Sequence, residues 1–293
     1  NIVTTIFPEY DWVRQILGDK ADSAEITMLL DNGVDLHSYQ PSADDIVKIS
    51  DCDLFIYVGG ESDGWVKDLL KNAFNKNRKV ISLLDVLGNS VKTEEVIEGM
   101  EGHDHDEDDG HEHEEEKDEH VWLSLKNAEV LVNAISDALQ KIDPGNKDAY
   151  AANTDAYVKR LSDLDAGYQS AVDGAARKTV LFGDRFPFRL LADDYALSYY
   201  AAFVGCSAES EASFETISFL AEKADELNLP CVLTIEGTQH KIAETIVQNT
   251  AEKNQKILTM DSMQSTTSRD AANGTTYLSV MENNLSVLKE ALD

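Results

Sequence analysis

The amino-acid sequence predicts an α/β protein with two lobes joined by one long, rigid helix. The first observation is an alternation of short apolar runs with amphipathic segments over the first ninety residues. The second is a mostly helical stretch in the middle of the chain, and the third is a return of the alternation beyond it. Because strands that alternate with helices usually pair in parallel, each lobe is expected to hold a parallel sheet with a helical cover.

The N-terminal lobe is predicted over residues 1–140. Its clearest strand is the apolar run 54–58, closed by two glycines, which is typical of a buried parallel strand. A helix is expected to start after Ser42, with Ser42 as the N-cap and Asp45 three residues on. The other strands are expected at 2–7, 24–30 and 80–84, and the other helices at 9–17 and 65–75.

A linking helix is predicted over residues 146–175. Apolar or aromatic side chains recur there at close to helical spacing, after the break at Pro144 and Gly145. Thirty helical residues span roughly 45 Å at 1.5 Å per residue, which is enough to connect two lobes. The C-terminal lobe is predicted over 176–293, with strands at 179–182, 197–203, 231–235 and 256–260 and helices at 188–194, 215–227, 242–253 and 278–292.

The composition limits which kinds of binding partner are expected. The 293 residues carry a formal net charge of −30, which disfavours nucleic acid and anionic membrane surfaces and attracts cations. No apolar run approaches the roughly 18–20 residues that a membrane helix needs. The opening strand resembles a mature N-terminus from which a targeting segment has been removed. The three cysteines lack any Cys-x-x-Cys spacing, so at most one disulfide is expected.

A tract rich in histidine and acid occupies residues 102–120 and overlaps an acidic loop predicted at about 94–119. Five of the seven histidines lie in this tract: His103, His105, His111, His113 and His120. Imidazole nitrogen and carboxylate oxygen are ligands that Zn²⁺ accepts, so the tract indicates metal capture. A solvated acidic loop is the alternative, but it would explain the acids and not the clustered histidines. The like charges favour a mobile loop.

Two histidines are candidates for a fixed site. His37 lies in a loop between a strand and a helix, where ligand sites of parallel sheets collect, although a lone loop histidine is more often a surface residue. His120 lies where the chain turns from charged to apolar, so it can be held rigidly. No Gly-x-Ser-x-Gly, His-Glu-x-x-His or phosphate-loop motif is present, and no enzyme constellation is visible.

Three further side chains could join such a site. Glu236 and Asp261 each follow an apolar strand directly and would project at a sheet end, with a helix cap as the equal alternative. Cys206 is a soft potential ligand, but a small buried residue is the better default.

These residues resemble a known family. The chain is similar to the metal-binding solute-binding proteins of zinc and manganese ABC importers, the ZnuA/TroA-like class. The matching stretches, in chain order, are 2–10, 35–42, 53–59 with Gly64-Trp65, 120–123, 211–213, 261–262 and 277–285. A histidine and acid insertion just before the second ligand histidine is typical of the zinc-selective members.

The resemblance implies two α/β lobes with a single metal between them. It implies His37 and His120 as two ligands and Asp261 as a late acidic ligand. At the family's third ligand position this chain has Arg185, a cation that cannot ligate. Several alternatives stay open: Asp184 or Cys206 supplies the ligand, water fills the position, or Arg185 pairs with an acid such as Glu211 or Glu236.

The function implied is that of an extracytoplasmic receptor without catalysis, which captures Zn²⁺ and delivers it to an ABC membrane permease. Such a receptor is expected to be a monomer, periplasmic or anchored to the membrane as a lipoprotein. Mn²⁺ is a less favoured cargo, because this harder ion prefers oxygen-rich sites. The tract histidines would add weak sites. The rivals are a manganese receptor, a secreted metal buffer or cell-adhesion protein, and, least favoured, a zinc hydrolase.

Overall fold

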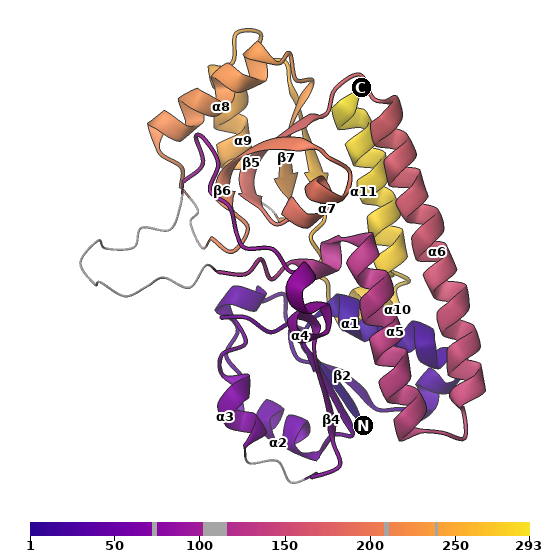
Figure 1. The fold of residues 1–293 in the computed structure, drawn as a ribbon. Helices are drawn as coiled ribbons and strands as arrows, with labels where there is room; N and C mark the ends of the chain where they lie inside the picture. Colours follow the sequence, from indigo (N-terminus) through magenta and orange to yellow (C-terminus); the bar gives the residue numbers. More distant parts are fainter. Residues whose placement is uncertain (72–74, 102–115, 208–210, 238–239) are drawn as a thin grey trace. The chain divides into compact units, whose positions relative to one another are not determined.

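The computed structural model forms two compact units, each assembled from three stretches of the chain (Figure 1). Unit 1 comprises 1–91, 124–165 and 263–280, and unit 2 comprises 92–123, 166–262 and 281–293. The structure describes residues 1–71, 75–101, 116–207, 211–237 and 240–293. The tract histidines His103, His105, His111 and His113 lie outside the described residues. Contiguous lobes at 1–140 and 176–293 stay a prediction.

The sheet of unit 1 has four parallel strands in the order β2-β1-β3-β4. The strands are β1 (Ile2–Thr4), β2 (Ile26–Met28), β3 (Leu54–Tyr57) and β4 (Lys79–Ser82). Leu54, Phe55 and Ile56 of β3 are fully buried, as the unbroken apolar run predicts. The parallel sheet expected from the strand and helix alternation is confirmed for this unit.

The helices of unit 1 begin at sequence-encoded caps. They are α1 (Phe7–Leu17), α2 (Ala43–Asp51), α3 (Val66–Leu70), α4 (Leu83–Leu87), α5 (Leu125–Ile142) and α10 (Ser268–Ala272). Ser42 caps α2 as predicted, because its hydroxyl accepts the Asp45 N–H while the Asp45 carboxylate accepts the Ser42 N–H. The first strand is shorter than predicted. Phe7 begins α1 because Pro8 suits the first helical turn and Glu9 accepts the N–H groups of Thr5 and Ile6.

Two helices contribute residues to both units. The predicted helix at 146–175 is α6 (Lys147–Gly174), and its buried positions include Tyr150, Tyr157 and Leu161. Its role as a link between lobes stays a prediction. The C-terminal helix is α11 (Tyr277–Leu292), and the Tyr168 hydroxyl donates to the Met281 carbonyl within unit 2. None of the helices in the described parts of the chain combines the length and apolar character needed to cross a bilayer.

The sheet of unit 2 is also parallel, in the order β6-β5-β7-β8, and carries α8 and α9 (Figure 1). Its elements are β5 (Thr179–Phe186), α7 (Arg189–Asp194), β6 (Ser198–Val204), α8 (Phe214–Glu226), β7 (Cys231–Ile235), α9 (Lys241–Asn249) and β8 (Lys256–Met260). β5 runs four residues past its predicted end at Phe182. Gly183 permits this, since a Cβ there would lie 2.6 Å from the Cα of Ala243 in α9.

Candidate metal centre

His37 is a restrained side chain of unit 1. It lies in the 3₁₀ turn η2 (Leu36–Ser38), and its backbone N–H donates to Oδ1 of Asp35 at 3.0 Å. Its Nδ1 is 2.8 Å from the hydroxyl of Ser62, and only 12% of its side chain is exposed. Nε2 lies 4.0 Å from Oδ1 of Asp35. The ring is therefore held in place, unlike that of an ordinary surface histidine.

His120 is a fully buried side chain of unit 2. Its Nδ1 lies 3.0 Å from Oδ1 of Asp118, and the same oxygen accepts the His120 backbone N–H at 2.9 Å. Because an ionised carboxylate can only accept, this contact favours the tautomer with the hydrogen on Nδ1, in which Nε2 is the nitrogen able to ligate a metal. The His120 and Trp122 rings are 5.3 Å apart between centroids. The rigid setting predicted for His120 is confirmed.

Cys206 lies beside His120 in unit 2. The ligand atoms of these two residues are within 4.8 Å of one another. The neighbouring Gly205 makes room for the imidazole, since a Cβ there would lie 3.1 Å from Nδ1 of His120 and 3.0 Å from the Phe186 carbonyl oxygen. The backbone N–H of Cys206 donates to Oε1 of Glu94 at 2.9 Å. The structure thus brings together an imidazole and a thiol that the sequence separates by 86 positions.

The surroundings of Cys206 favour a neutral thiol in the absence of metal. Burial is the main cause that raises the pKa of this thiol far above its usual range, and the carboxylates of Glu94 and Glu119 raise it further. Glu94 also accepts a hydrogen bond from the thiol. A metal ion that binds here has to displace the thiol proton, as metals do at coordinating cysteines.

Asp261 and Glu236 lie at neighbouring strand ends of unit 2. The backbone of Asp261 is held on both sides by Asn284, whose amide accepts its N–H and donates to its carbonyl, both at 2.8 Å. The Glu236 carboxylate accepts the N–H and the hydroxyl of Ser262, both at 2.7 Å. Glu236 therefore anchors the loop that presents Asp261. Within the described residues, neither acid is grouped with the His120 and Cys206 pair.

The remaining sequence candidates have other contacts. Asp184 accepts the backbone N–H groups of Arg185 at 2.9 Å and Ile235 at 3.3 Å, so it ties β5 to β7. Burial raises the pKa of Asp184, against the smaller effects of these hydrogen bonds and of the Arg185 cation, which lower it. Arg185 pairs in register with Phe203 of β6. Glu211 is exposed in the loop before α8.

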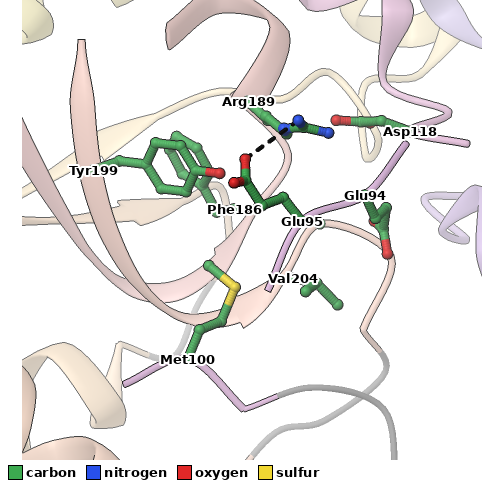
Figure 2. A pocket seen from close by; sticks show the side chains of 9 residues that line it. Glu94, Glu95, Met100, Asp118, Phe186, Arg189, Tyr199 and Val204 are labelled. Atoms are coloured by element: carbon green, nitrogen blue, oxygen red, sulfur yellow. Dashed lines mark ion pairs between the residues drawn. The ribbon is translucent and has the colours of Figure 1, made fainter. Parts of the chain in front are cut away.

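A pocket in unit 2 adjoins the His120 environment (Figure 2). The space between its lining side chains measures about 210 Å³ when the part open to solvent is counted. Its lining residues are Glu94, Glu95, Met100, Asp118, Phe186, Arg189, Tyr199, Val204 and Gly205. Figure 2 shows the ion pair between Arg189 and Glu95, with Nη2 and Oε2 3.2 Å apart. Burial raises the pKa of Tyr199 to about 12.

The flanks of the histidine tract are attached to unit 2. Thr93 and Lys117 form an antiparallel bridge, and Glu101 pairs with Phe203 at the edge of β6. The Lys92 amine lies 2.6 Å from an Asp193 carboxylate oxygen. The sequence does not single out Glu94, because its only signal is a charge within an acidic stretch, and charge does not distinguish a solvated acid from an anchoring one. Arg189, at the start of α7, carries no signal in the sequence that would mark it.

Comparisons with known proteins agree on one family. The family model described as "Zinc-uptake complex component A periplasmic" (ZnuA) matches residues 2–291. The zinc-binding lipoprotein AdcA of Streptococcus pneumoniae strain R6 is 32% identical over all of this chain and 56% of its own length. The high-affinity zinc uptake system protein ZnuA of Bacillus subtilis strain 168 is 31% identical over all of this chain and 87% of its own length.

The fold agrees as well. The crystal structure of the Zn(II)-bound ZnuA-like domain of S. pneumoniae AdcA matches all of this chain and 98% of that domain, with a TM-score of 0.76 and 30% identity. The predicted two-lobe α/β fold is confirmed. The chain spans little more than half the length of the AdcA proteins it matches. The extent of the family match shows that this chain belongs to the ZnuA family of zinc-uptake components.

Proposed function

We propose that this chain is an extracytoplasmic receptor that binds one Zn²⁺ ion tightly and delivers it to the membrane permease of an ABC importer. The observation that carries the proposal is the buried His120, whose Nδ1 lies 3.0 Å from the Asp118 carboxylate. This contact supports the tautomer in which Nε2 can ligate a metal. The relatives named as zinc-binding and zinc-uptake proteins support zinc as the cargo. The role is that of a carrier, without catalysis.

The proposed ligands are His37 of unit 1 and His120 and Asp261 of unit 2. Each is restrained by its own partners: His37 by Asp35 and Ser62, and Asp261 by Asn284. Preorganised ligands favour binding because less conformational freedom is lost when the metal arrives. Imidazole ligands favour zinc over manganese, which prefers carboxylate, carbonyl and water oxygens.

The tract histidines are proposed to form several weak sites that raise the local zinc concentration. Delivery to a permease, attachment to the membrane as a lipoprotein and a monomeric state are further parts of the proposal. The word lipoprotein in the name of the pneumococcal relative supports the second of these.

A chelator-competition titration of the metal-free protein with Zn²⁺ and Mn²⁺ tests the proposal. The variants are His37→Ala, His120→Ala and a replacement of residues 102–115 by a short Gly-Ser linker, which keeps the bridge between Thr93 and Lys117. His240→Ala is the matched control, because this histidine lies at the start of α9 outside the proposed ligand set.

One tight zinc event is expected, retained in the linker variant and in His240→Ala and lost in His37→Ala and His120→Ala. Manganese should bind far more weakly. If tight binding disappears with the tract and survives both histidine substitutions, the receptor site is wrong and a metal buffer is the better description.

A further inference from the structure

We propose that Cys206 is a thiolate ligand of the bound zinc and supplies the position that Arg185 cannot fill. The inference rests on the zinc site proposed above and names one of its ligands. It would make the site a mixed sulfur, nitrogen and oxygen centre.

The geometry of unit 2 supports a metal shared by His120 and Cys206. Zinc–sulfur and zinc–nitrogen bonds of about 2.3 and 2.1 Å at a tetrahedral angle place the two ligand atoms roughly 3.6 Å apart. The observed separation is within 4.8 Å, so a small side-chain adjustment suffices. Both residues lie on well-restrained backbone: His120 beside Asp118, and Cys206 on the hydrogen bond to Glu94.

The position of Cys206 in the chain supports a role as a ligand. Gly205 and Cys206 are the first two residues after β6. Cys206 therefore lies at the carboxyl end of a parallel strand, where ligand sites collect. A Cβ at position 205 would lie only 3.1 Å from the imidazole, so glycine at this position leaves room for the His120 ring next to Cys206. Two carboxylates contact this pair, Glu94 at the Cys206 N–H and Asp118 at Nδ1 of His120, so the surroundings can balance the charge of a divalent cation.

The other candidates for the missing ligand are weaker. Both carboxylate oxygens of Asp184 accept backbone N–H groups, one from Arg185 in β5 and one from Ile235 in β7. Glu211 is exposed in the loop that precedes α8. Cys231 is buried at the start of β7, and Cys52 is buried in unit 1 after α2. Within the described residues, Cys206 is the cysteine that lies in a metal-ligating cluster.

A thiolate changes what the site selects. When zinc binds, the thiol proton leaves to solvent and a zinc–sulfur bond forms, so the thiolate offsets one of the two positive charges of the ion. A soft sulfur ligand favours zinc over hard ions such as Mn²⁺. Cys206 is thus proposed to be a residue that determines metal specificity.

X-ray absorption at the zinc edge tests this directly, on protein of residues 1–293 loaded with one equivalent of Zn²⁺. The wild type and the Cys231→Ala control should each show one sulfur neighbour near 2.3 Å, and Cys206→Ser should show only nitrogen and oxygen.

Cobalt loading gives a second readout, because a thiolate ligand produces a near-ultraviolet charge-transfer band that Cys206→Ser and Cys206→Ala should lack. In both Cys206 variants the zinc Kd should rise more than about 100-fold. This exceeds the 10–100-fold loss typical when a residue that only hydrogen-bonds a metal ligand is replaced.

The outcomes separate this inference from the proposed function. Tight zinc binding with only nitrogen and oxygen neighbours in the wild type would overturn the role of Cys206 and leave the receptor standing. Absence of tight zinc binding in the wild type would overturn both. Cys206→Ser both removes the sulfur and introduces a hydroxyl, whereas Cys206→Ala only removes the sulfur. A loss of zinc affinity in both variants is therefore due to the missing sulfur.

Discussion

Asp118 contacts His120 twice through one carboxylate oxygen, which lies 3.0 Å from the ring Nδ1 and 2.9 Å from the backbone nitrogen. The two contacts fix both the ring orientation and the tautomer, and they direct Nε2 away from the carboxylate. Asp118 itself is 2% exposed, so the pair is shielded from competing water. In this account it defines the unit 2 part of the zinc site.

Substitution of Asp118 should weaken zinc binding without removing a ligand. Asp118→Ala is expected to raise the zinc Kd by about 10- to 100-fold, because the imidazole loses its tautomer-fixing partner. Asp118→Asn should have a smaller effect, since an amide oxygen can still accept the Nδ1 hydrogen. Chelator competition measures both, with Asp193→Asn on α7 as the control. Equal Kd values in Asp118→Ala and wild type would show that the contact does not serve the metal.

Gly205→Ala should disturb His120 by direct contact. The new Cβ would lie 3.0 Å from the Phe186 carbonyl oxygen and 3.1 Å from the imidazole, so the ring or the strand must shift. We expect a loss of about 1–3 kcal/mol in the free energy of unfolding, together with a weaker zinc affinity. Urea denaturation and zinc titration measure the two effects. Gly174→Ala is the control because no atom lies within 4 Å of its added Cβ, and a similar loss there would remove the steric explanation.

Asn284→Ala should loosen the loop that carries Asp261. The substitution removes two 2.8 Å hydrogen bonds at a side chain that is 1% exposed, which leaves the Asp261 N–H and carbonyl without these partners. A loss of about 1–3 kcal/mol in the free energy of unfolding is expected, with a higher zinc Kd. The exposed Asn133→Ala provides the comparison in urea denaturation. Unchanged zinc affinity in a folded Asn284→Ala protein would count against Asp261 as a ligand.

Glu9 should make the metal-free protein less stable as pH rises. Burial raises the pKa of this fully buried carboxyl from near 4.5 to about 8, and Asp63 adds to the effect, against hydrogen bonds from Thr5 and Ile6. Between these values the native state binds a proton that the unfolded state has lost. This group therefore lowers the free energy of unfolding by up to about 1.4 kcal/mol per pH unit as pH rises through that range.

Glu9→Gln should flatten this dependence, because the amide does not ionise. Urea denaturation at pH 5, 6.5 and 8 measures the slope, and the exposed Glu282→Gln should keep the wild-type slope. An identical slope in Glu9→Gln would mean that the carboxyl titrates alike in the folded and unfolded states.

The parallel sheets could be predicted because their strands are encoded locally. The run of Leu54, Phe55 and Ile56 is apolar at every position, and only a strand buried on both faces needs that pattern. The end of β5 could not be predicted in the same way. The polar residues after Phe182 read as a loop, whereas strand pairing through Arg185 depends on β6, a non-local neighbour.

The residues of the candidate site also differ in whether local sequence or non-local contacts identify them. The sequence singles out His37 by its place between a strand and a helix, and His120 by the change from charged to apolar residues. Asp35 and Asp118, which contact them, are each two positions away, whereas Ser62 is 25 positions from His37. Glu94 contacts Cys206 across 112 positions, so only the folded chain shows that an acid of the tract's flank holds the cysteine.

The location of the metal in a crystal grown with one equivalent of Zn²⁺ tests the central claim most directly, through anomalous diffraction at the zinc edge. The account predicts one strong peak bonded to Nε2 of His120, with His37 and Asp261 among its ligands. A principal peak on the tract histidines, or one away from His120, would contradict it.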